Sequence, residues 1–495
     1  MIFGNICNSF SYYFNNIKYA FKIINLIYYI TCNDITSFDN KKLNKLKLQL
    51  IDNGAIAIKF MQWFLSKKIS ENDNGDYNYI IDVFNDLFDN CPHHSLQETE
   101  DLFLKNFKVD MKDIIDYSSL KVIGSGSIGQ VYKAKLLNGE EIAMKVRHPS
   151  VSKIIPGQMY IINILIYLQK FSFTKNLLSL HIDIDDFMYN LLLQLDFTNE
   201  VYNTLKFRKN FSDNTIIVIP EIFYYGKDII ISKYEEGKDL NTLSLFQKQK
   251  AGIAMYCFII QMTLFDNFIH GDLHKKNWSL RKLENSNELQ LVVYDFGLCF
   301  KSDNVIHNRN LWSACEDNDK DGLFSVMKHL VKSSKNINID DIYPKIEPQI
   351  TEMYKESLTT TNLLKRLVCI LKEHDLYLKR IFLNLIVVFT LIEKILVDSG
   401  VININQKTIL PNRNDFNNSR DGDIVAYTKK YPFYSHIEKY YRKKYDRIKK
   451  KSIFNQIENT STLTLVFDDI DFSNSLKDDY EDEKNDATEK TPLLS

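Results

Sequence analysis

Two short runs of alternating apolar and polar residues, 131–136 and 141–146, lie on either side of Asn138-Gly139. An Asn-Gly dipeptide in this position is a strong signal for a two-stranded hairpin. Because side chains alternate across a strand, the apolar residues of the second run share one face and Lys145 lies on the other. We therefore predict a hairpin that buries one face and directs Lys145 into a cleft. The alternative is a solvent-facing lysine on an edge strand.

Longer patterns predict helices and further strands. The predicted helices cover 79–87, 187–207, 249–268 and 381–392. The last of these is an apolar run too short to span a bilayer, so we interpret it as a buried helix. Strands at 215–219 and 229–232 are expected to continue the sheet of the hairpin.

A glycine-rich segment precedes the hairpin and fits the kinase pattern G-x-G-x-x-G-x-V. Dinucleotide-binding folds use similar glycines but need a helix directly after the loop, whereas a strand follows here. A P-loop is excluded because Gln130 stands where its lysine would be. We therefore predict a nucleotide-binding loop, with Lys145 contacting the α- and β-phosphates. Its residues are Gly124, Ser125, Gly126, Ser127, Ile128, Gly129, Gln130 and Val131.

The chemistry-bearing residues lie further along the chain. His270-Gly271-Asp272 is followed by Asn277 and then by Asp295-Phe296-Gly297, which is the spacing of a protein-kinase catalytic loop. Phosphoryl transfer needs a carboxylate that orients or deprotonates the acceptor, and we assign this role to Asp272. It also needs oxygen ligands for magnesium, and we assign these to Asn277 and Asp295. The expected cofactors are ATP and Mg²⁺.

The chain resembles the UbiB/ADCK (aarF-domain-containing) family of atypical kinases over roughly residues 46–400. Five segments carry the resemblance: 54–63, 127–134, 145–149, 195–203 and 270–277. It implies an α+β, two-lobed protein-kinase-like fold with a small antiparallel β-sheet lobe, a larger helical lobe and an N-terminal helical extension over the cleft. It further implies that Glu200, which the helical pattern alone leaves as either a partner of Lys145 or a solvated side chain, pairs with that lysine. Lys59 and Gln62 would belong to the extension as regulatory residues.

The expected domain organisation follows from these assignments. An apolar N-terminal segment would cover 1–45, the helical extension 46–112, the small lobe 113–237, the large lobe 238–400, and a basic helix with an acidic tail 401–495. In this last part 438–451 is basic, 468–489 is acidic, and 489–494 resembles a dileucine sorting signal.

Several positions depart from the family pattern. Met61 replaces a glycine, Gln194 replaces a glutamate, and Lys275-Lys276 replace Pro-Gly in the catalytic loop. These two lysines are consistent either with an anionic acceptor or with a solvated loop. Glycines and a serine at 124–126 replace alanines, so we expect this loop to approach phosphate as closely as that of an ordinary kinase.

Composition limits the partners. A net charge of −1 argues against general nucleic-acid binding. The 7 cysteines include no C-x-x-C pair, which favours an intracellular reducing compartment without structural disulfides or cysteine-bound metal. The apolar segment 10–30 could be an interfacial membrane helix or a docked helix, and no arginine precedes Arg147, unlike a transit peptide. A nucleotide is thus the expected partner, a lipid or membrane surface stays open, and the sequence does not indicate the oligomeric state.

The family is linked to isoprenoid-quinone lipid metabolism, and the resemblance implies an ATPase or lipid kinase more than a protein kinase. The absence of an Ala-Pro-Glu after Gly297 also disfavours peptide substrates. Two alternatives stay open. One is a small-molecule kinase of the aminoglycoside/choline type, and the other is a nucleotide-binding pseudokinase that acts as a scaffold.

Overall fold

The computed structural model describes most of residues 17–400. The gaps are 20, 31–32, 72–78, 81–82, 85–90, 152–183, 213, 239–241, 274–275, 283–288, 303–304, 306, 309–310, 312–319, 334–338 and 356–359. The basic and acidic segments predicted after residue 401, and the sorting signal, lie outside the described residues. The chain forms two compact units. Unit 1 holds 1–203, 220–235 and 295–298, and unit 2 holds the remainder.

Unit 1 is built on a five-stranded antiparallel sheet with the order β1-β2-β3-β6-β5. The strands are β1 (Ile115–Ser125), β2 (Gly129–Leu136), β3 (Glu141–Arg147), β5 (Ile222–Tyr225) and β6 (Ile229–Lys233). The predicted hairpin is present between β2 and β3, where Gly139 has a positive φ of 89° and donates to the carbonyl of Leu136 at 2.8 Å. The glycine-rich loop joins β1 to β2, so it connects two strands as predicted.

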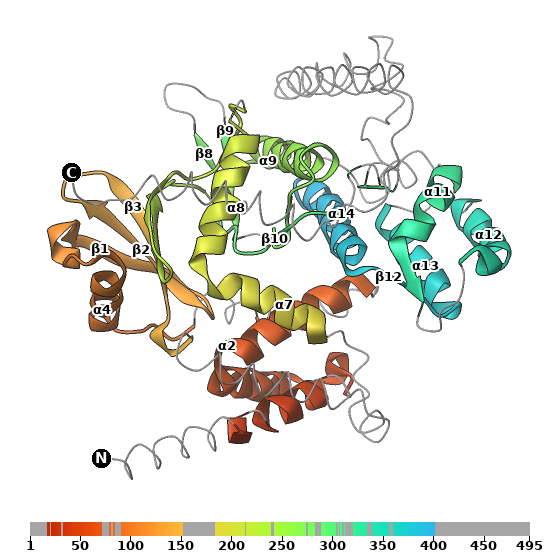
Figure 1. The fold of residues 1–495 in the computed structure, drawn as a ribbon, viewed down its shortest axis with the longest axis horizontal. Helices are drawn as coiled ribbons and strands as arrows, with labels where there is room; N and C mark the ends of the chain where they lie inside the picture. Colours follow the sequence, from red (N-terminus) through yellow and green to blue (C-terminus); the bar gives the residue numbers. More distant parts are fainter. Residues whose placement is uncertain are drawn as a thin grey trace, which may run out of the picture. The chain divides into compact units, whose positions relative to one another are not determined.

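One face of this sheet packs against helix α4 (Leu96–Phe107) (Figure 1). Met144 of β3 and Phe103 of α4 are both fully buried in this core. A capping box starts α4, because Ser95 accepts from the backbone of Glu98 while the Glu98 carboxylate accepts from the backbone of Ser95. The short helix η3 (Met111–Asp113) then leads into β1.

Unit 1 also contains longer helices. They are α2 (Asn40–Glu71), which follows the short helix η1 (Ile35–Ser37), α7 (Ile184–Leu195) and the first part of α8 (Phe197–Asn210). Helix α2 is kinked at Gly54, where φ is 75°, and it lies beside α7 (Figure 1), with the rings of Phe60 and Phe187 in an edge contact at 5.5 Å. Met61 of α2 is fully buried.

The single helix predicted over 187–207 is wrong, because the chain breaks at Asp196. The Asp196 carboxylate accepts from the backbone N–H of Thr198 at 3.0 Å and from its hydroxyl at 2.7 Å. An aspartate that satisfies the free N–H groups of the next turn is a helix N-cap. The break therefore starts α8 afresh, with Glu200 in its first turn.

Unit 2 contains helix α9 (Leu245–Ile260), which continues as the π-helical turn η5 (Gln261–Phe265) and leads into the predicted catalytic loop. Its three-stranded sheet has the order β4-β9-β8, formed by β4 (Ile217–Val218), β9 (Leu289–Val293) and β8 (Trp278–Lys282). A second small sheet pairs β7 (Ile269–His270) with β10 (Cys299–Phe300).

The strand at 217–218 does not continue the sheet of the hairpin as expected. It pairs in parallel with β9, placing Ile217 opposite Leu291. Gln290 also donates to the carbonyl of Thr215 at 2.7 Å. These bonds take up the backbone groups that a strand of the other sheet would need.

The rest of unit 2 is mostly helical. It comprises α11 (Lys320–Leu330), β11 (Val331–Ser333), α12 (Ile339–Lys355), α13 (Thr360–Glu373), β12 (Leu376–Leu378) and α14 (Arg380–Asp398). Helix α14 packs on α9 and α13, and its Phe382 and Phe389 are buried, as predicted for the run at 381–392. Within the described residues, no helix is both long and apolar enough to span a bilayer.

Candidate functional site

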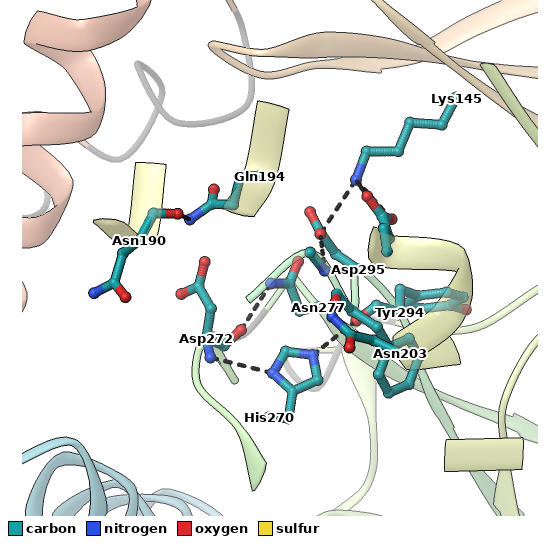
Figure 2. Close-up of polar contacts among 12 residues, drawn as sticks. Lys145, Asn190, Gln194, Asn203, His270, Asp272, Asn277, Tyr294 and Asp295 are labelled. Atoms are coloured by element: carbon teal, nitrogen blue, oxygen red, sulfur yellow. Dashed lines mark hydrogen bonds and ion pairs between the residues drawn. The ribbon is translucent and has the colours of Figure 1, made fainter. Parts of the chain in front are cut away.

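Lys145 is the centre of a charge cluster in unit 1, in which Glu200 is buried, Lys145 is partly buried and Asp295 is exposed. Lys145 Nζ lies 2.8 Å from Oε1 and 2.7 Å from Oε2 of Glu200. It also lies 3.1 Å from Oδ1 of Asp295 (Figure 2). Strand β3 directs Lys145 away from the core face, and the first turn of α8 presents Glu200 to it. The fold thus brings Glu200 and Asp295, which lie 55 and 150 positions after Lys145 in the sequence, to one ammonium group.

The cluster contains one cation and two carboxylates. Burial alone would lower the pKa of Lys145, but the carboxylates of Asp295 and Glu200 outweigh it and hold that pKa above its ordinary value. Burial raises the pKa of the Glu200 carboxyl to about 7, although Lys145 opposes this shift. The charge of Lys59 on α2 also lowers the pKa of Glu200. Lys145 is therefore protonated, and two carboxyl groups share its single positive charge.

Asp295 is held in an unusual backbone conformation. Its φ is 52°, in the left-handed region that few residues other than glycine, asparagine and aspartate adopt. Its Oδ1 accepts from the backbone N–H of Gly297 at 3.3 Å. The next residue is also fixed, because Asn203 Nδ2 donates to the carbonyl of Phe296 at 2.8 Å. The backbone therefore sets the direction of the Asp295 carboxylate.

Gly297 is closely surrounded by side chains of this cluster. A Cβ there would lie 3.1 Å from Asp295 Oδ1, 3.5 Å from Glu200 Oε2 and 3.7 Å from Gln194 Cγ. Gln194, which replaces the family's glutamate, thus sits next to the two carboxylates. A neutral amide at this position adds no further negative charge to the cluster.

The glycines of the loop differ in whether the surrounding structure leaves room for a Cβ atom. A Cβ at Gly129 would lie 2.5 Å from the carbonyl oxygen of Val146, so β2 could not approach β3 there with any other residue. A Cβ at Gly124 would meet nothing within 4 Å. The protein's own packing explains the glycine at 129 but not the one at 124.

We expect Gly129→Ala to destabilise unit 1 by about 1–3 kcal/mol, the usual cost of overpacking a tight site. Gly124→Ala is the matched control and should change the free energy of unfolding by no more than about 0.5 kcal/mol. Urea unfolding of both variants measures the difference. Equal effects of the two substitutions would contradict this account of the loop.

Two hydroxyls in the loop lack partners. Ser125 Oγ and Ser127 Oγ are both buried and make no hydrogen bond within the part of the chain that the structure describes. A buried polar atom without a partner costs about 1–3 kcal/mol, so such atoms often belong to ligand sites. Both hydroxyls fit a loop that binds phosphate oxygens.

The predicted catalytic loop of unit 2 is ordered by His270, which is fully buried. Its Nδ1 accepts from the backbone N–H of Asp272 at 3.1 Å, so the proton lies on Nε2, which donates to the carbonyl of Tyr294 at 3.2 Å (Figure 2). Asn277 Nδ2 donates to the carbonyl of Asp272 at 2.8 Å. Because the amide nitrogen is fixed by a carbonyl, the Asn277 side-chain oxygen is the atom left to ligate a cation.

The predicted site residues therefore fall into two sets. Lys145, Glu200, Asp295 and the glycine loop lie in unit 1, where the first three are in direct contact. Asp272 and Asn277 lie together in unit 2. Lys275 is outside the described residues, and Lys276 is exposed. The catalytic, metal and cofactor roles of all these residues stay predictions.

Sequence reasoning missed a buried ion pair behind the cluster. Arg147, two residues after Lys145, bonds to Asp228 and to the carbonyl of Leu195. The carbonyl of Leu195 ends α7, directly before the cap of the helix that carries Glu200. The only sign of this pair in the sequence was an arginine directly after a predicted strand. Its partner could not be identified because it lies 81 residues away.

Comparison with known proteins identifies relatives of this chain. Residues 86–327 match the model of the ABC1 atypical kinase-like domain. The chain is 29% identical over 246 residues to a Dictyostelium discoideum protein named probable serine/threonine-protein kinase abkC, covering 48% of this chain and 34% of that protein. It is 23% identical over 285 residues to AarF domain-containing protein kinase 1 of Gallus gallus, covering 55% and 52%. The matches thus span from about a third to about half of these relatives' lengths.

One solved structure, the complex of Rv3197 with erythromycin from Mycobacterium tuberculosis, is 18% identical to this chain. It covers 53% of this chain and 67% of the other at a TM-score of 0.39. The kinase-like fold is assigned from the family match and from the order of strands and helices described above.

Proposed function

Residues 86–327 of this chain belong to the ABC1 atypical kinase-like family, and from this premise we propose that the protein binds ATP with Mg²⁺ and transfers or hydrolyses the terminal phosphoryl group. The observation that carries the proposal is the triad of Lys145, Glu200 and Asp295. A lysine held by a helical glutamate and an Asp-Phe-Gly aspartate is the arrangement that kinases use to hold phosphates and metal.

The residues present fit Mg²⁺ and ATP. One ammonium faces two acidic side chains, and a divalent cation would stabilise the ionised form of both. Asp295 offers a carboxylate and Asn277 an amide oxygen, which are ligands that magnesium prefers. The unpartnered hydroxyls of Ser125 and Ser127 support phosphate binding by the loop.

Each residue has a distinct task in this proposal. Lys145 binds the α- and β-phosphates, and Glu200 orients Lys145. Asn277 and Asp295 hold the metal, which neutralises charge on the phosphates when bound. Asp272 orients the acceptor or takes its proton, while the hydrogen bond from its own backbone N–H to His270 fixes the loop.

The acceptor we propose is a lipid or another small molecule rather than a peptide. The resemblance to UbiB proteins and the missing Ala-Pro-Glu support this choice. Lys59 and Gln62 would regulate the site from α2, and the electrostatic effect of Lys59 on Glu200 supports a position near the cluster. A reducing compartment is consistent with Cys91, Cys257 and Cys299, which are buried and form no disulfide within the described residues.

A second candidate function is a pseudokinase that binds nucleotide and organises other enzymes. Gln194 favours it, because an amide stands beside Gly297 where the family has a carboxylate that could help bind metal. ATP consumption separates the two functions.

We expect Asp272→Asn to lower ATP consumption by about 10²–10⁴-fold while nucleotide binding persists, because a positioned carboxylate contributes about that much to proton transfer. Phosphate release by the purified chain with Mg²⁺, with and without a phenolic or isoprenoid lipid, measures this. Asp341→Asn, at an exposed position of α12, is the control and should retain parental turnover. Parent protein that binds ATP but never consumes it, with or without lipid, would favour the pseudokinase.

A further inference from the structure

The glycine loop is held from behind by polar groups that take no part in the proposed phosphate contacts. The backbone N–H of Cys91 donates to the carbonyl of Ser125 at 2.7 Å, and that of His148 donates to the carbonyl of Ile128 at 2.8 Å. The His148 ring reaches the loop as well, with Nε2 3.0 Å from the carbonyl oxygen of Gly126. Three backbone carbonyls of the loop are therefore fixed by residues outside it.

The contact with Gly126 determines the protonation of two histidines. A carbonyl can only accept, so His148 Nε2 carries a proton and, in the neutral ring, Nδ1 is the acceptor. His148 Nδ1 lies 2.7 Å from His94 Nδ1, which must then be the donor. His94 Nε2 is left as an acceptor and lies 2.9 Å from the hydroxyl of Thr99. The two imidazoles are therefore opposite tautomers.

The same logic extends into the core. The Thr99 hydroxyl donates to His94, so it accepts from the Tyr132 hydroxyl at 2.8 Å, and Tyr132 accepts in turn from Gln130 Nε2. Gln130 Oε1 also accepts from the backbone N–H of His94 at 3.0 Å. Thr99 and Gln130 are fully buried, and Tyr132 is nearly so. One directional chain of hydrogen bonds thus runs from β2 through α4 and two histidines to the loop, with every donor and acceptor satisfied.

The environment favours the neutral rings that this chain requires. Burial, together with the neighbouring His148, lowers the pKa of His94 to about 4, and burial also lowers the pKa of His148. The charged or titratable side chains that act on both rings are His93 and Glu98, which have opposite effects. A proton added to His148 would set two N–H groups against each other at Nδ1. A proton added to His94 would go to Nε2, where it would face the hydrogen of the Thr99 hydroxyl, so either event would break the chain.

We propose that His94 and His148 are positioning residues for nucleotide binding. As neutral imidazoles of opposite tautomer, they connect the core of unit 1 to the carbonyl of Gly126 and hold the glycine loop in the shape that receives phosphates. The expected effect on nucleotide affinity rests on the proposed function. The expected effect on the conformation of the loop does not. Neither histidine contacts the Lys145 cluster, so their effect passes through the loop.

The test compares three variants of the full chain. His148→Leu removes the donor to Gly126, whereas His148→Gln places an amide N–H near the position of Nε2 and cannot titrate. His93→Leu is the matched control, since His93 is exposed and adjacent to His94. Amide hydrogen exchange of residues 124–129 reports the loop directly, and the Kd for ATP with Mg²⁺ reports its use.

We expect His148→Leu to speed exchange in the loop and to weaken ATP binding, each by about tenfold, the effect of losing one hydrogen bond. His148→Gln should recover both to within about threefold, and His93→Leu should match the parent. Nitrogen-15 NMR of the parent imidazoles near neutral pH should show His94 protonated on Nδ1 and His148 on Nε2. This last measurement holds even if the leucine variant does not fold.

The outcomes separate the two proposals. If the parent binds no ATP but the variants change loop exchange as described, the proposed function is refuted. The role of the histidines in holding the loop then still stands. Unchanged exchange and affinity in His148→Leu would overturn the positioning role, as would equal losses in the leucine and glutamine variants or identical tautomers for the two rings.

Discussion

Replacing Asp295 with asparagine is expected to abolish Mg²⁺-dependent ATP binding without unfolding the chain. The substitution keeps the shape of the side chain and its hydrogen bond from Gly297 but removes the charge that faces Lys145 and would hold the metal. An amide is a far weaker magnesium ligand than a carboxylate. We expect at least a 100-fold loss of affinity, about 2.7 kcal/mol, by titration calorimetry.

The folded state should tolerate this change. Asp295 raises the pKa of the buried Glu200, so its loss relieves repulsion between two carboxylates that share one lysine. The melting midpoint without nucleotide should therefore be equal to or above that of the parent. Asp110→Asn, at an exposed position before η3, should leave both ATP affinity and midpoint unchanged. Parental affinity for Mg-ATP in Asp295→Asn would refute the metal assignment.

The second large effect concerns stability. Asp228→Asn is expected to lower the free energy of unfolding by about 3–5 kcal/mol, because it leaves the Arg147 guanidinium charged and buried without its counter-charge. The Arg147 and Asp228 side chains are 8% and 3% exposed. Arg147 also holds the carbonyl of Leu195, so the pair ties the end of α7 to the sheet beside β3. Urea unfolding measures the loss.

A second cation contacts the same carboxylate and provides the control. Lys105 Nζ lies 3.5 Å from Asp228 Oδ2, but its side chain is 68% exposed. Exposed ion pairs contribute about 0–1 kcal/mol, so Lys105→Ala should have little effect. If Lys105→Ala and Asp228→Asn cost the same, burial would not be the source of the stability.

The pH dependence of stability has a definite sign here. Burial would raise the pKa of Asp228, but Arg147 and the hydrogen bond from Asn106 hold it below the ordinary value. The contribution of Asp228 is therefore fully present above its unfolded pKa of about 3.9 and is lost as pH falls through the lower folded pKa. Below pH 4 the gap in stability between the parent and Asp228→Asn should narrow.

Local sequence patterns predicted the structural features that depend only on residues close together in the chain. Alternation and the Asn-Gly turn gave the β2–β3 hairpin and the direction of Lys145, because a strand's two faces are fixed by its own side chains. The run at 381–392 gave a buried helix because its apolar character and its length can be read from neighbouring residues alone. Resemblance to a family added Glu200 as the partner of Lys145, which the helical pattern alone left undecided.

Features that depend on distant residues were missed. The break before α8 comes from Asp196, which resembles any other helix residue until its hydrogen bonds to Thr198 are seen. The pairing of β4 with β9 joins segments more than 70 residues apart. The partners of Arg147 are likewise remote, as is His148 from His94, so no local period could indicate these contacts.

The most direct test of the central claim is the melting midpoint of the purified chain as ATP is raised with Mg²⁺ present. A ligand that binds the folded state at 100 times its Kd stabilises it by about 2.7 kcal/mol. The parent midpoint, and that of the control Lys135→Met on the exposed side of β2, should therefore rise with nucleotide, and that of Lys145→Met should not. A parent midpoint indifferent to Mg-ATP, or an equal rise in Lys145→Met, would contradict a nucleotide site built on Lys145.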